Sequence, residues 1–436
     1  MGVFFGTDGL RGKVNVDLTS DVAYKCGNAL ATLLPFCTIL IGCDTRNSSS
    51  FLTCSFASGA TNGGANVIDL GTVPTAGVAY LTKRLTADFG VVISASHNSK
   101  EYNGIKIFDK NGFKLDEKQE LLLERNFIQT KTCPFNKIGK YVQRHQLVTL
   151  YKDFLMQTST RLDGLFVLLD CANGASGNIA PRVFKKLGAK VLAFNTKTDG
   201  MSINENCGAL HPEKLAQKVV KLSADVGFAF DGDADRLIAV DKFGKVIDGD
   251  MVIFGLAKYL KSKGTLKGDK VVGTSHTNMG VEKELKNLGV LLIRADVGDK
   301  YVLQKMLSED VVVGGEQSGH VILKDLHTTG DGILTALALS NIVVKENTTL
   351  DKVCAVKKFP QTNVNVEVCD KFRVMNNERL ANEISKWSNV LGDNGRLLIR
   401  SSGTEDKIRV MVESGEAKSN EHIANVVANL IKEIDC

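Results

Sequence analysis

Short runs of apolar and β-branched residues alternate with longer amphipathic stretches over most of the chain. In the first part, amphipathic stretches predict a helix over residues 20–34, capped by Thr19 or Ser20, and another over residues 49–61. The runs that predict strands between and after them are residues 38–42, 66–70, 88–93 and 104–108. Strands separated by helices of this length are typical of βα units and of a largely parallel sheet.

The same alternation continues beyond the polar stretch around residues 137–144. The next strands are predicted at residues 165–169, 190–194, 226–230 and 237–240, and a third group at residues 270–274, 291–294 and 311–313. After Phe359 and Pro360 the pattern changes to that of antiparallel strands, at residues 364–368, 397–399 and 409–412, with a closing helix over residues 422–434. We therefore expect three α/β domains with mixed sheets (1–148, 149–248 and 249–358) and a smaller α+β domain (359–436).

Composition limits the classes of protein that this chain can be. A chain of 436 residues with 43% hydrophobic and 24% charged residues is expected to fold as a soluble protein. Its net charge of +5 suits anionic metabolites, and the sequence has no basic tract for nucleic acid and no apolar run long enough for a membrane span. Ten cysteines without a Cys-x-x-Cys pair argue against a zinc ribbon or a disulfide scaffold, so a reducing cytoplasm is expected.

Three aspartates directly after the apolar run 226–230 are candidate metal ligands. Asp231, Asp233 and Asp235 alternate with small residues, which aims their carboxylates to one side, and such hard oxygen ligands suit Mg²⁺, Mn²⁺ or Ca²⁺. An EF-hand is excluded because Arg236 and Lys242 occupy the positions of its glycine and final carboxylate. A solvated acidic turn is the alternative, but clustered carboxylates repel one another without a cation, which favours a metal site.

A serine-containing segment, residues 94–98, follows another apolar strand. Open α/β sheets place ligands at the carboxyl ends of their strands, so a Ser96 hydroxyl there can carry a phosphoryl group. The alternative is an ordinary turn that ends a strand. No Gly-x-Ser-x-Gly motif surrounds this serine, so an esterase-type triad is not supported. The serine and the acidic loop together indicate metal-assisted phosphoryl transfer.

Two further segments offer groups that bind sugars and phosphates. In residues 314–320, Glu316 and Ser318 can hydrogen-bond sugar hydroxyls and His320 can move a proton, although a single histidine is more often structural. The segment that begins at Arg400 combines arginine, hydroxyl groups and a glycine amide into a phosphate cradle, for which a β-turn is the alternative. No Walker loop competes for the phosphate role.

Taken in this order, the segments resemble the α-D-phosphohexomutase superfamily, and most closely its branch of bacterial phosphoglucosamine mutases. The motifs that carry the resemblance are residues 5–12, 44–46, 74–75, 170–175, 204–208, 297–302 and 314–320. The Gln317 form of the last motif indicates the glucosamine branch. Two positions depart from the usual pattern, because Ser99 and Asp406 stand where the family usually has proline, and both changes remove a conformational restraint.

The resemblance implies four domains around a central active-site cleft, and a role for each matching residue. Ser96 would be the phosphoserine and would hold Mg²⁺ together with Asp231, Asp233 and Asp235. Glu316 and Ser318 would bind sugar hydroxyls. The residues that would clamp the distal phosphate are Arg400, Ser402, Gly403, Thr404 and Arg409. Those that would surround the transferring phosphoryl group are Arg11, His97, Lys106, Arg236 and His320.

The implied activity is the reversible conversion of glucosamine 6-phosphate to glucosamine 1-phosphate, with glucosamine or glucose 1,6-bisphosphate as intermediate or activator. The product would feed the synthesis of UDP-N-acetylglucosamine and of cell-wall precursors. The alternatives are a phosphomannomutase or phosphoglucomutase of the same superfamily, a metal-dependent sugar phosphatase, and a sugar-phosphate sensor without turnover. We expect a cytoplasmic monomer or homodimer that acts on a small sugar phosphate, with no nucleic-acid or membrane partner.

Overall fold

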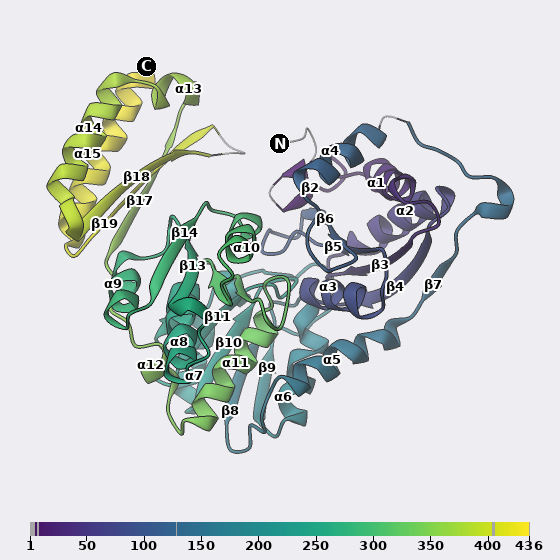
Figure 1. The fold of residues 1–436 in the computed structure, drawn as a ribbon, viewed down its shortest axis with the longest axis horizontal. Helices are drawn as coiled ribbons and strands as arrows, with labels where there is room; N and C mark the ends of the chain where they lie inside the picture. The colour runs from purple at the N-terminus through teal and green to yellow at the C-terminus, as the bar shows by residue number, and fades with distance from the viewer. Residues whose placement is uncertain (1–4, 7, 128, 403–405, 436) are drawn as a thin grey trace. The chain divides into compact units, whose positions relative to one another are not determined.

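The computed structural model describes residues 5–6, 8–127, 129–402 and 406–435 (Figure 1). The chain divides into two compact units. The first unit comprises Met1–His276 and Gly289–Ala355, and the second comprises Thr277–Leu288 and Val356–Cys436. Three mixed sheets lie in the first unit and one antiparallel sheet lies in the second, as expected for three α/β domains followed by an α+β domain.

The first sheet has seven strands in the order β1-β2-β6-β5-β3-β4-β7. The strands are β1 (Phe5–Gly6), β2 (Gly9–Lys13), β3 (Thr38–Cys43), β4 (Asn66–Thr72), β5 (Phe89–Ile93), β6 (Tyr102–Asp109) and β7 (Tyr141–Gln143). The pairs around β3 are parallel, and those around β2 and β6 are antiparallel. The four predicted strands of this part are confirmed, whereas β1, β2 and β7 were not predicted because they are short or weakly apolar.

Helices cover both faces of this sheet. They are α1 (Ser20–Leu33), α2 (Ser49–Asn62), α3 (Thr75–Arg84) and α4 (Glu117–Asn126). Helices α1 and α2 bury their apolar sides in one core with the sheet, and burying each large aliphatic or aromatic side chain contributes about 1.5–3 kcal/mol. The two helices pack closely at Gly27 and Gly59, where an added Cβ would lie only 2.1 Å from the carbonyl oxygen of Phe56 and 1.9 Å from that of Tyr24. Both helices predicted here are confirmed.

The second and third sheets follow the same plan, with orders β12-β11-β10-β8-β9 and β14-β13-β15-β16. Their strands are β8 (Phe166–Asp170), β9 (Lys190–Phe194), β10 (Val226–Phe230), β11 (Leu237–Asp241), β12 (Val246–Ile247), β13 (Lys270–Thr274), β14 (Leu291–Ala295), β15 (Val313–Gly315) and β16 (Val321–Leu323). The strand predicted at residues 311–313 begins two residues later, because Val311 N–H bonds back to Met306 at the end of a helix.

The helices of these parts are α5 (Val148–Gln157), α6 (Ala180–Lys186), α7 (Glu213–Leu222), α8 (Gly249–Ser262), α10 (Asp299–Ser308), α11 (Gly332–Lys345) and α12 (Leu350–Val353). Short 3₁₀ turns lie at η1 (Phe135–Lys137), η2 (His145–Leu147), η3 (Ala175–Asn178), η4 (Gly208–Leu210), η5 (Lys267–Asp269) and η6 (Gly392–Asn394).

None of the helices in the described part of the chain combines the length and the apolar character that a membrane span requires.

The second unit contains a three-stranded antiparallel sheet in the order β17-β19-β18. Its strands are β17 (Gln361–Glu367), β18 (Gly395–Ser401) and β19 (Lys407–Ser414), and its helices are α13 (Lys371–Met375), α14 (Glu378–Leu391) and α15 (Ala417–Asp435). The antiparallel strands and the closing helix are confirmed. Helix α9 (Met279–Asn287) also belongs to this unit, because the buried Glu413 accepts a hydrogen bond of 2.8 Å from the Met279 N–H.

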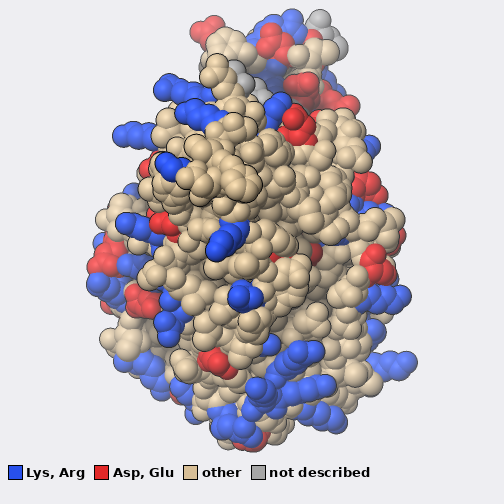
Figure 2. All heavy atoms as spheres, turned by 90° about the vertical axis from the view of Figure 1, so that its right-hand side faces the viewer, with Lys and Arg blue, Asp and Glu red and all other residues tan. Residues whose placement is uncertain are grey.

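Both signs of charge occur on the face of the molecule drawn in Figure 2. Figure 2 shows one face on which lysine and arginine side chains are interspersed with aspartate and glutamate, and basic side chains gather at the lower end of that view.

A buried aspartate at the start of α11 gives a testable effect on stability. Burial raises the pKa of Asp331 from 3.8 to about 6, although its carboxylate accepts hydrogen bonds from Leu334 N–H and from the Tyr151 hydroxyl. Between these two pH values the folded state binds a proton that the unfolded state releases, so the stability of the protein falls as pH rises. The loss of stability is complete above about pH 6, where the buried carboxyl group is ionised in the folded state as well.

Asp331→Asn is therefore expected to stabilise the fold at pH 8 by about 1–3 kcal/mol, because asparagine caps a helix without charge and can donate to the tyrosine oxygen. Thermal unfolding at pH 5 and pH 8 measures this, and the gain is expected to be smaller at pH 5. Asp116→Asn is the control, since Asp116 caps α4 but is exposed. Destabilisation at both pH values would contradict the assignment.

Candidate active site

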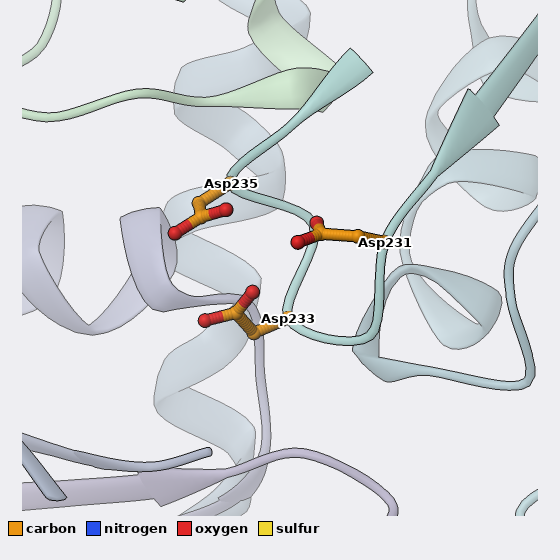
Figure 3. Close-up of side chains that lie close together, drawn as sticks. All are labelled: Asp231, Asp233 and Asp235. Carbon is orange, nitrogen blue, oxygen red and sulfur yellow. The ribbon is translucent and has the colours of Figure 1, made fainter. Parts of the chain in front are cut away.

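The three predicted aspartates lie in the tight loop between β10 and β11. Phe230 and Leu237 pair at the base of this hairpin, and the Ala234 N–H donates to the Asp231 carbonyl at 3.1 Å. All three carboxylates are buried, and one oxygen of each lies within 4.8 Å of the others. Figure 3 shows the side chains of Asp231, Asp233 and Asp235 pointing toward one another. The structure thus brings together the three carboxylates that the sequence indicated as metal ligands.

The electrostatics of this trio fit a bound cation. Burial, followed by the charges of Asp235 and Asp233, raises the pKa of Asp231 well above its ordinary value. Among the described residues, Asp233 Oδ1 is buried without a hydrogen-bond partner, while its other oxygen accepts a bond of 2.5 Å from the Thr75 hydroxyl. An unpartnered buried carboxylate oxygen is costly unless something positive binds it. The donor set, all carboxylate oxygen, is the kind that Mg²⁺ prefers.

The predicted serine lies against these aspartates. Ser96 follows β5 and is buried, and its hydroxyl donates to Asp231 Oδ2 at 2.6 Å and lies 3.5 Å from Asp235 Oδ1. Its backbone has a φ of 50°, a left-handed conformation that is uncommon for a residue with a side chain and costs about 1–3 kcal/mol. Backbone strain of this kind is typical of functional sites.

Basic side chains surround this junction on several sides. Lys106, on β6, is buried, and its Nζ lies 2.8 Å from Asp233, 3.1 Å from Asp235 and 3.2 Å from Asp8. Burial lowers the pKa of Lys106, but its three carboxylate partners outweigh burial and hold that pKa well above the usual value. Lys106 therefore stays a cation.

Two arginines complete this basic surround. Arg11 pairs with Asp8 and donates to the Asn98 side chain at 3.0 Å. The Nε of Arg236 lies 3.9 Å from Asp235 Oδ1 and makes no hydrogen bond among the described residues, although it is buried. Arg236 thus lies beside a carboxylate that the serine approaches, and Arg11 lies beside Asp8, which Lys106 links to the same group of carboxylates.

Two histidines flank the same carboxylates, and their pKa values are shifted in opposite directions. His97 Nδ1 lies 3.3 Å from the Ser96 hydroxyl, and burial, aided by Arg236 and Arg11, lowers the pKa of His97 to about 3, so its ring is neutral at pH 7. His320 lies between Asp235 and Asp299, at 3.8 Å and 3.6 Å. Burial lowers the pKa of His320, but the hydrogen bond and charge of Asp235 outweigh this and raise it.

The β15–β16 hairpin carries the predicted sugar-binding side chains. Glu316 Oε1 accepts a hydrogen bond of 3.0 Å from the Gly298 N–H, and its Oε2 accepts one of 3.3 Å from the exposed Ser318 hydroxyl. The Glu316 N–H bonds to the His320 carbonyl at 3.0 Å, so the hairpin presents the carboxylate and the imidazole from one tight turn. Both residues lie in the first unit with Ser96.

The predicted phosphate clamp lies in the second unit. Arg400 on β18 and Arg409 on β19 are paired directly across the sheet, and Ser402 is buried at the end of β18. Burial and the charge of Arg409 lower the pKa of Arg400, which is the expected effect of two like charges side by side. Gly403 and Thr404 lie outside the described residues, so the structure places only three of the five predicted clamp residues.

Several residues at this site had no role in the sequence interpretation. Asp8 pairs with Arg11, Lys106 and Lys114, and Lys114 also pairs with Asp299. Asp8, Thr75 and Asp299 all lie in segments that carried the family resemblance, which was the only signal for them. Lys114 carried no signal at all, because nothing in its local sequence distinguishes it from a solvated lysine.

Models of one family match the chain in four consecutive parts. They are described as "Phosphoglucomutase/phosphomannomutase", with alpha/beta/alpha domain I at residues 2–132, domain II at 145–244, domain III at 248–359 and the C-terminal domain at 364–430. The chain belongs to the phosphoglucomutase/phosphomannomutase family. The predicted membership of the phosphohexomutase superfamily is thereby confirmed, and the protein is an enzyme of the isomerase class.

Similar members of the phosphoglucomutase/phosphomannomutase family span the whole chain. "Phosphoglucosamine mutase" of Carboxydothermus hydrogenoformans is 44% identical, with 100% of each chain covered, and that of Clostridium botulinum strain Loch Maree is 44% identical, with 99% of each covered. Among solved structures, a family protein of Burkholderia thailandensis has a TM-score of 0.84 at 24% identity, covering 99% of this chain and 97% of its own. Aspergillus fumigatus N-acetylphosphoglucosamine mutase, in complex with GlcNAc-6P and magnesium, has a TM-score of 0.72 at 18% identity, covering 100% and 96%. These two likenesses show the shared fold.

Proposed function

We propose that this enzyme interconverts glucosamine 6-phosphate and glucosamine 1-phosphate through a phosphoserine at Ser96 and a bound 1,6-bisphosphate. The observation that carries the proposal is the Ser96 hydroxyl, 2.6 Å from a carboxylate of the buried aspartate trio and surrounded by basic side chains. The curated relatives named phosphoglucosamine mutase support the choice of sugar. The product would supply the synthesis of UDP-N-acetylglucosamine and of cell-wall precursors.

The residues present fit a magnesium ion. Asp231, Asp233 and Asp235 would hold it together with the phosphate of Ser96, and the unpartnered oxygen of Asp233 is the kind of ligand it requires. When bound, the ion would neutralise negative charge on the phosphoserine and so favour transfer of its phosphoryl group. The proposal includes one ion per chain, because Asp231, Asp233 and Asp235 form one such trio among the described residues.

The chain's own residues perform the transfer in two steps, each of which moves one phosphoryl group and one proton. The bond between phosphorus and Ser96 Oγ breaks while a bond from phosphorus to the sugar O1 forms, and the O1 proton passes to His320. Of the two residues that the sequence offered for this proton, Lys106 is held as a cation by its carboxylate partners and has no lone pair to accept it, so it would stabilise the phosphoryl oxygens instead. The bisphosphate then turns end over end, and its O6 phosphoryl group returns to Ser96 while a proton returns to O6. Arg11 and Arg236 are placed to stabilise the charge that spreads over the phosphoryl oxygens, while His97 can hydrogen-bond to the seryl oxygen.

The remaining predicted residues hold the sugar. Glu316 and Ser318 offer a carboxylate and a hydroxyl to the sugar hydroxyls. The distal phosphate would bind to a cradle that must accept either phosphate in turn, and its members are Arg400, Ser402, Gly403, Thr404 and Arg409. Glucosamine or glucose 1,6-bisphosphate would act as the activator. The enzyme would act in the cytoplasm as a monomer or homodimer, without nucleic-acid or membrane partners.

Coupled assays with glucosamine, glucose and mannose phosphates test the choice of reaction. The proposal predicts the highest kcat/KM with glucosamine 6-phosphate and no steady release of inorganic phosphate. Preference for mannose or glucose phosphate would favour the phosphomannomutase or phosphoglucomutase alternative. Steady phosphate release without isomerisation would identify a sugar phosphatase instead, and binding without turnover would identify a sensor.

The paired arginines of the second unit give a prediction for substrate binding. Two like charges side by side are relieved by an anion, so Arg400→Gln is expected to lower kcat/KM by about 10–100-fold, as loss of a hydrogen bond to a charged group does. The stabilisation of the protein by glucose 1,6-bisphosphate, measured as a shift in Tm, is expected to shrink in parallel. Arg379→Gln is the control, since Arg379 is exposed on α14. Equal kinetics in both variants would remove Arg400 from the clamp.

A further inference from the structure

A buried arginine holds the backbone of the loop that carries Ser96. We call residues 94–102 the serine loop. Arg46, after β3, is 2% exposed, and each of its five guanidinium N–H groups has an acceptor. The acceptors are Asp44 Oδ2 (2.9 Å) and four carbonyl oxygens of the serine loop, those of Ser96 (2.9 Å), Asn98 (2.8 Å), Ser99 and Tyr102 (3.0 Å).

Asp44 links this guanidinium to the other side of the loop. Its Oδ2 also accepts a bond of 2.7 Å from the Ser94 hydroxyl, and that hydroxyl accepts one of 2.9 Å from the Ser96 N–H. The N–H and the carbonyl of Ser96 are therefore both fixed by the same pair of buried, oppositely charged side chains. The side chains of Asp44 and Arg46 are fully excluded from solvent, where such bonds are strong and costly to leave unmade.

The conformation that this pair fixes is one that Ser96 would not adopt by itself. Its φ of 50° is left-handed, and a serine in an unrestrained loop leaves that region. The Asn204 side-chain amide adds a second restraint, with bonds of 2.8 Å to the Ser96 carbonyl and 3.1 Å to that of Asn98. Position 99, where the family usually has proline, is held here through the Ser99 carbonyl by Arg46.

We infer that Arg46 is the positioning residue that sets the Ser96 hydroxyl against the aspartate trio, and this inference rests on the proposed function. Arg46 does not reach the reacting atoms. It acts through the serine loop, since four of its five hydrogen bonds end there and the fifth ends on Asp44. Lysine keeps the charge but offers three donors on a single nitrogen, so it cannot span four carbonyls.

Arg46→Lys tests this role, with Arg84→Lys, an exposed position at the end of α3, as the matched control. We expect kcat to fall by about 10²-fold, the usual result of misplacing a reacting group by about 1 Å, while KM changes by less than about 2-fold. Amide hydrogen exchange of the serine loop is expected to become at least about 10-fold faster, with exchange in α1 and the rest of the first sheet unchanged. The control is expected to match the wild type.

The outcomes are separable from failure of the proposed function. Hydrogen exchange needs no turnover, so it tests the hold of Arg46 on the loop even if the wild type isomerises no glucosamine phosphate. Unchanged loop exchange in a folded Arg46→Lys variant would overturn the inference, and so would a kcat per folded enzyme equal to that of the wild type. If Arg46→Lys does not fold, Ser94→Ala removes only the Ser94 bonds, and a fall in kcat of about 10-fold with faster loop exchange is expected.

Discussion

Ser96→Ala is expected to lower mutase activity by about 10⁴-fold or more, because a phosphoryl carrier cannot be replaced by a neighbouring group. The fold is expected to survive, since alanine removes only the hydroxyl, with its short bond to Asp231 and its longer contacts to Asp235 and His97. Because the variant also loses one hydrogen-bond donor to the aspartate trio, we expect a small decrease in Tm. Activity and folding should therefore separate in this variant.

Intact mass spectrometry together with the glucosamine phosphate assay measures both consequences. The wild type is expected to gain the mass of one phosphate after incubation with glucose 1,6-bisphosphate, and Ser96→Ala is expected to gain none. Ser58→Ala, an exposed serine of α2, is the control and should behave as the wild type. A phosphate adduct that persists in Ser96→Ala would place the carrier on another residue.

Asp231→Asn is expected to change stability and activity in opposite directions. Burial and the neighbouring aspartates raise the pKa of Asp231, so the metal-free trio opposes folding, and asparagine relieves that repulsion. Without Mg²⁺ the variant should be at least as stable as the wild type. With Mg²⁺ at about 100 times its Kd the wild type should gain about 2.7 kcal/mol, and the variant much less. Activity is expected to fall by at least about 10²–10³-fold, the scale of losing one preorganised electrostatic group.

Thermal unfolding with and without Mg²⁺ measures the first effect and the coupled assay measures the second. Asp21→Asn, on the exposed face of α1, is the matched control, and its Tm should respond to Mg²⁺ as that of the wild type does. A Tm of the wild type that does not respond to Mg²⁺ would remove the metal from the trio. A less stable Asp231→Asn in metal-free buffer would show that repulsion is not the dominant effect there.

The sequence predicts most of the regular structure, because strands and helices are encoded by local periodicity. The strand predicted over residues 226–230 is β10, and the loop with the three aspartates follows it directly, as the sequence predicts. The start of β15 was missed by two residues, since only a contact with the end of α10 sets it. Strands β1 and β2 were missed because a strand of two to five residues with several glycines carries little periodicity.

The chemistry of the site was predictable to the extent that it lies in short motifs. Serine and aspartates at strand ends are visible in the sequence, but their distance of 2.6 Å depends on strands that are more than a hundred residues apart. Lys114 and the hold of Arg46 on the serine loop could not be predicted, because both depend on which carbonyls and carboxylates the fold brings to a buried side chain. The four domain boundaries and the roles of the individual site residues stay predictions.

Transfer of label from the phosphorylated protein tests the central claim most directly. The enzyme is loaded with labelled phosphate from labelled glucose 1,6-bisphosphate, freed of excess reagent and mixed with unlabelled glucosamine 6-phosphate and Mg²⁺ for a single turnover. The label is predicted to leave Ser96 and to appear in the sugar phosphate. Label that stays on the protein, or that appears as inorganic phosphate, would contradict phosphoryl exchange between Ser96 and the sugar.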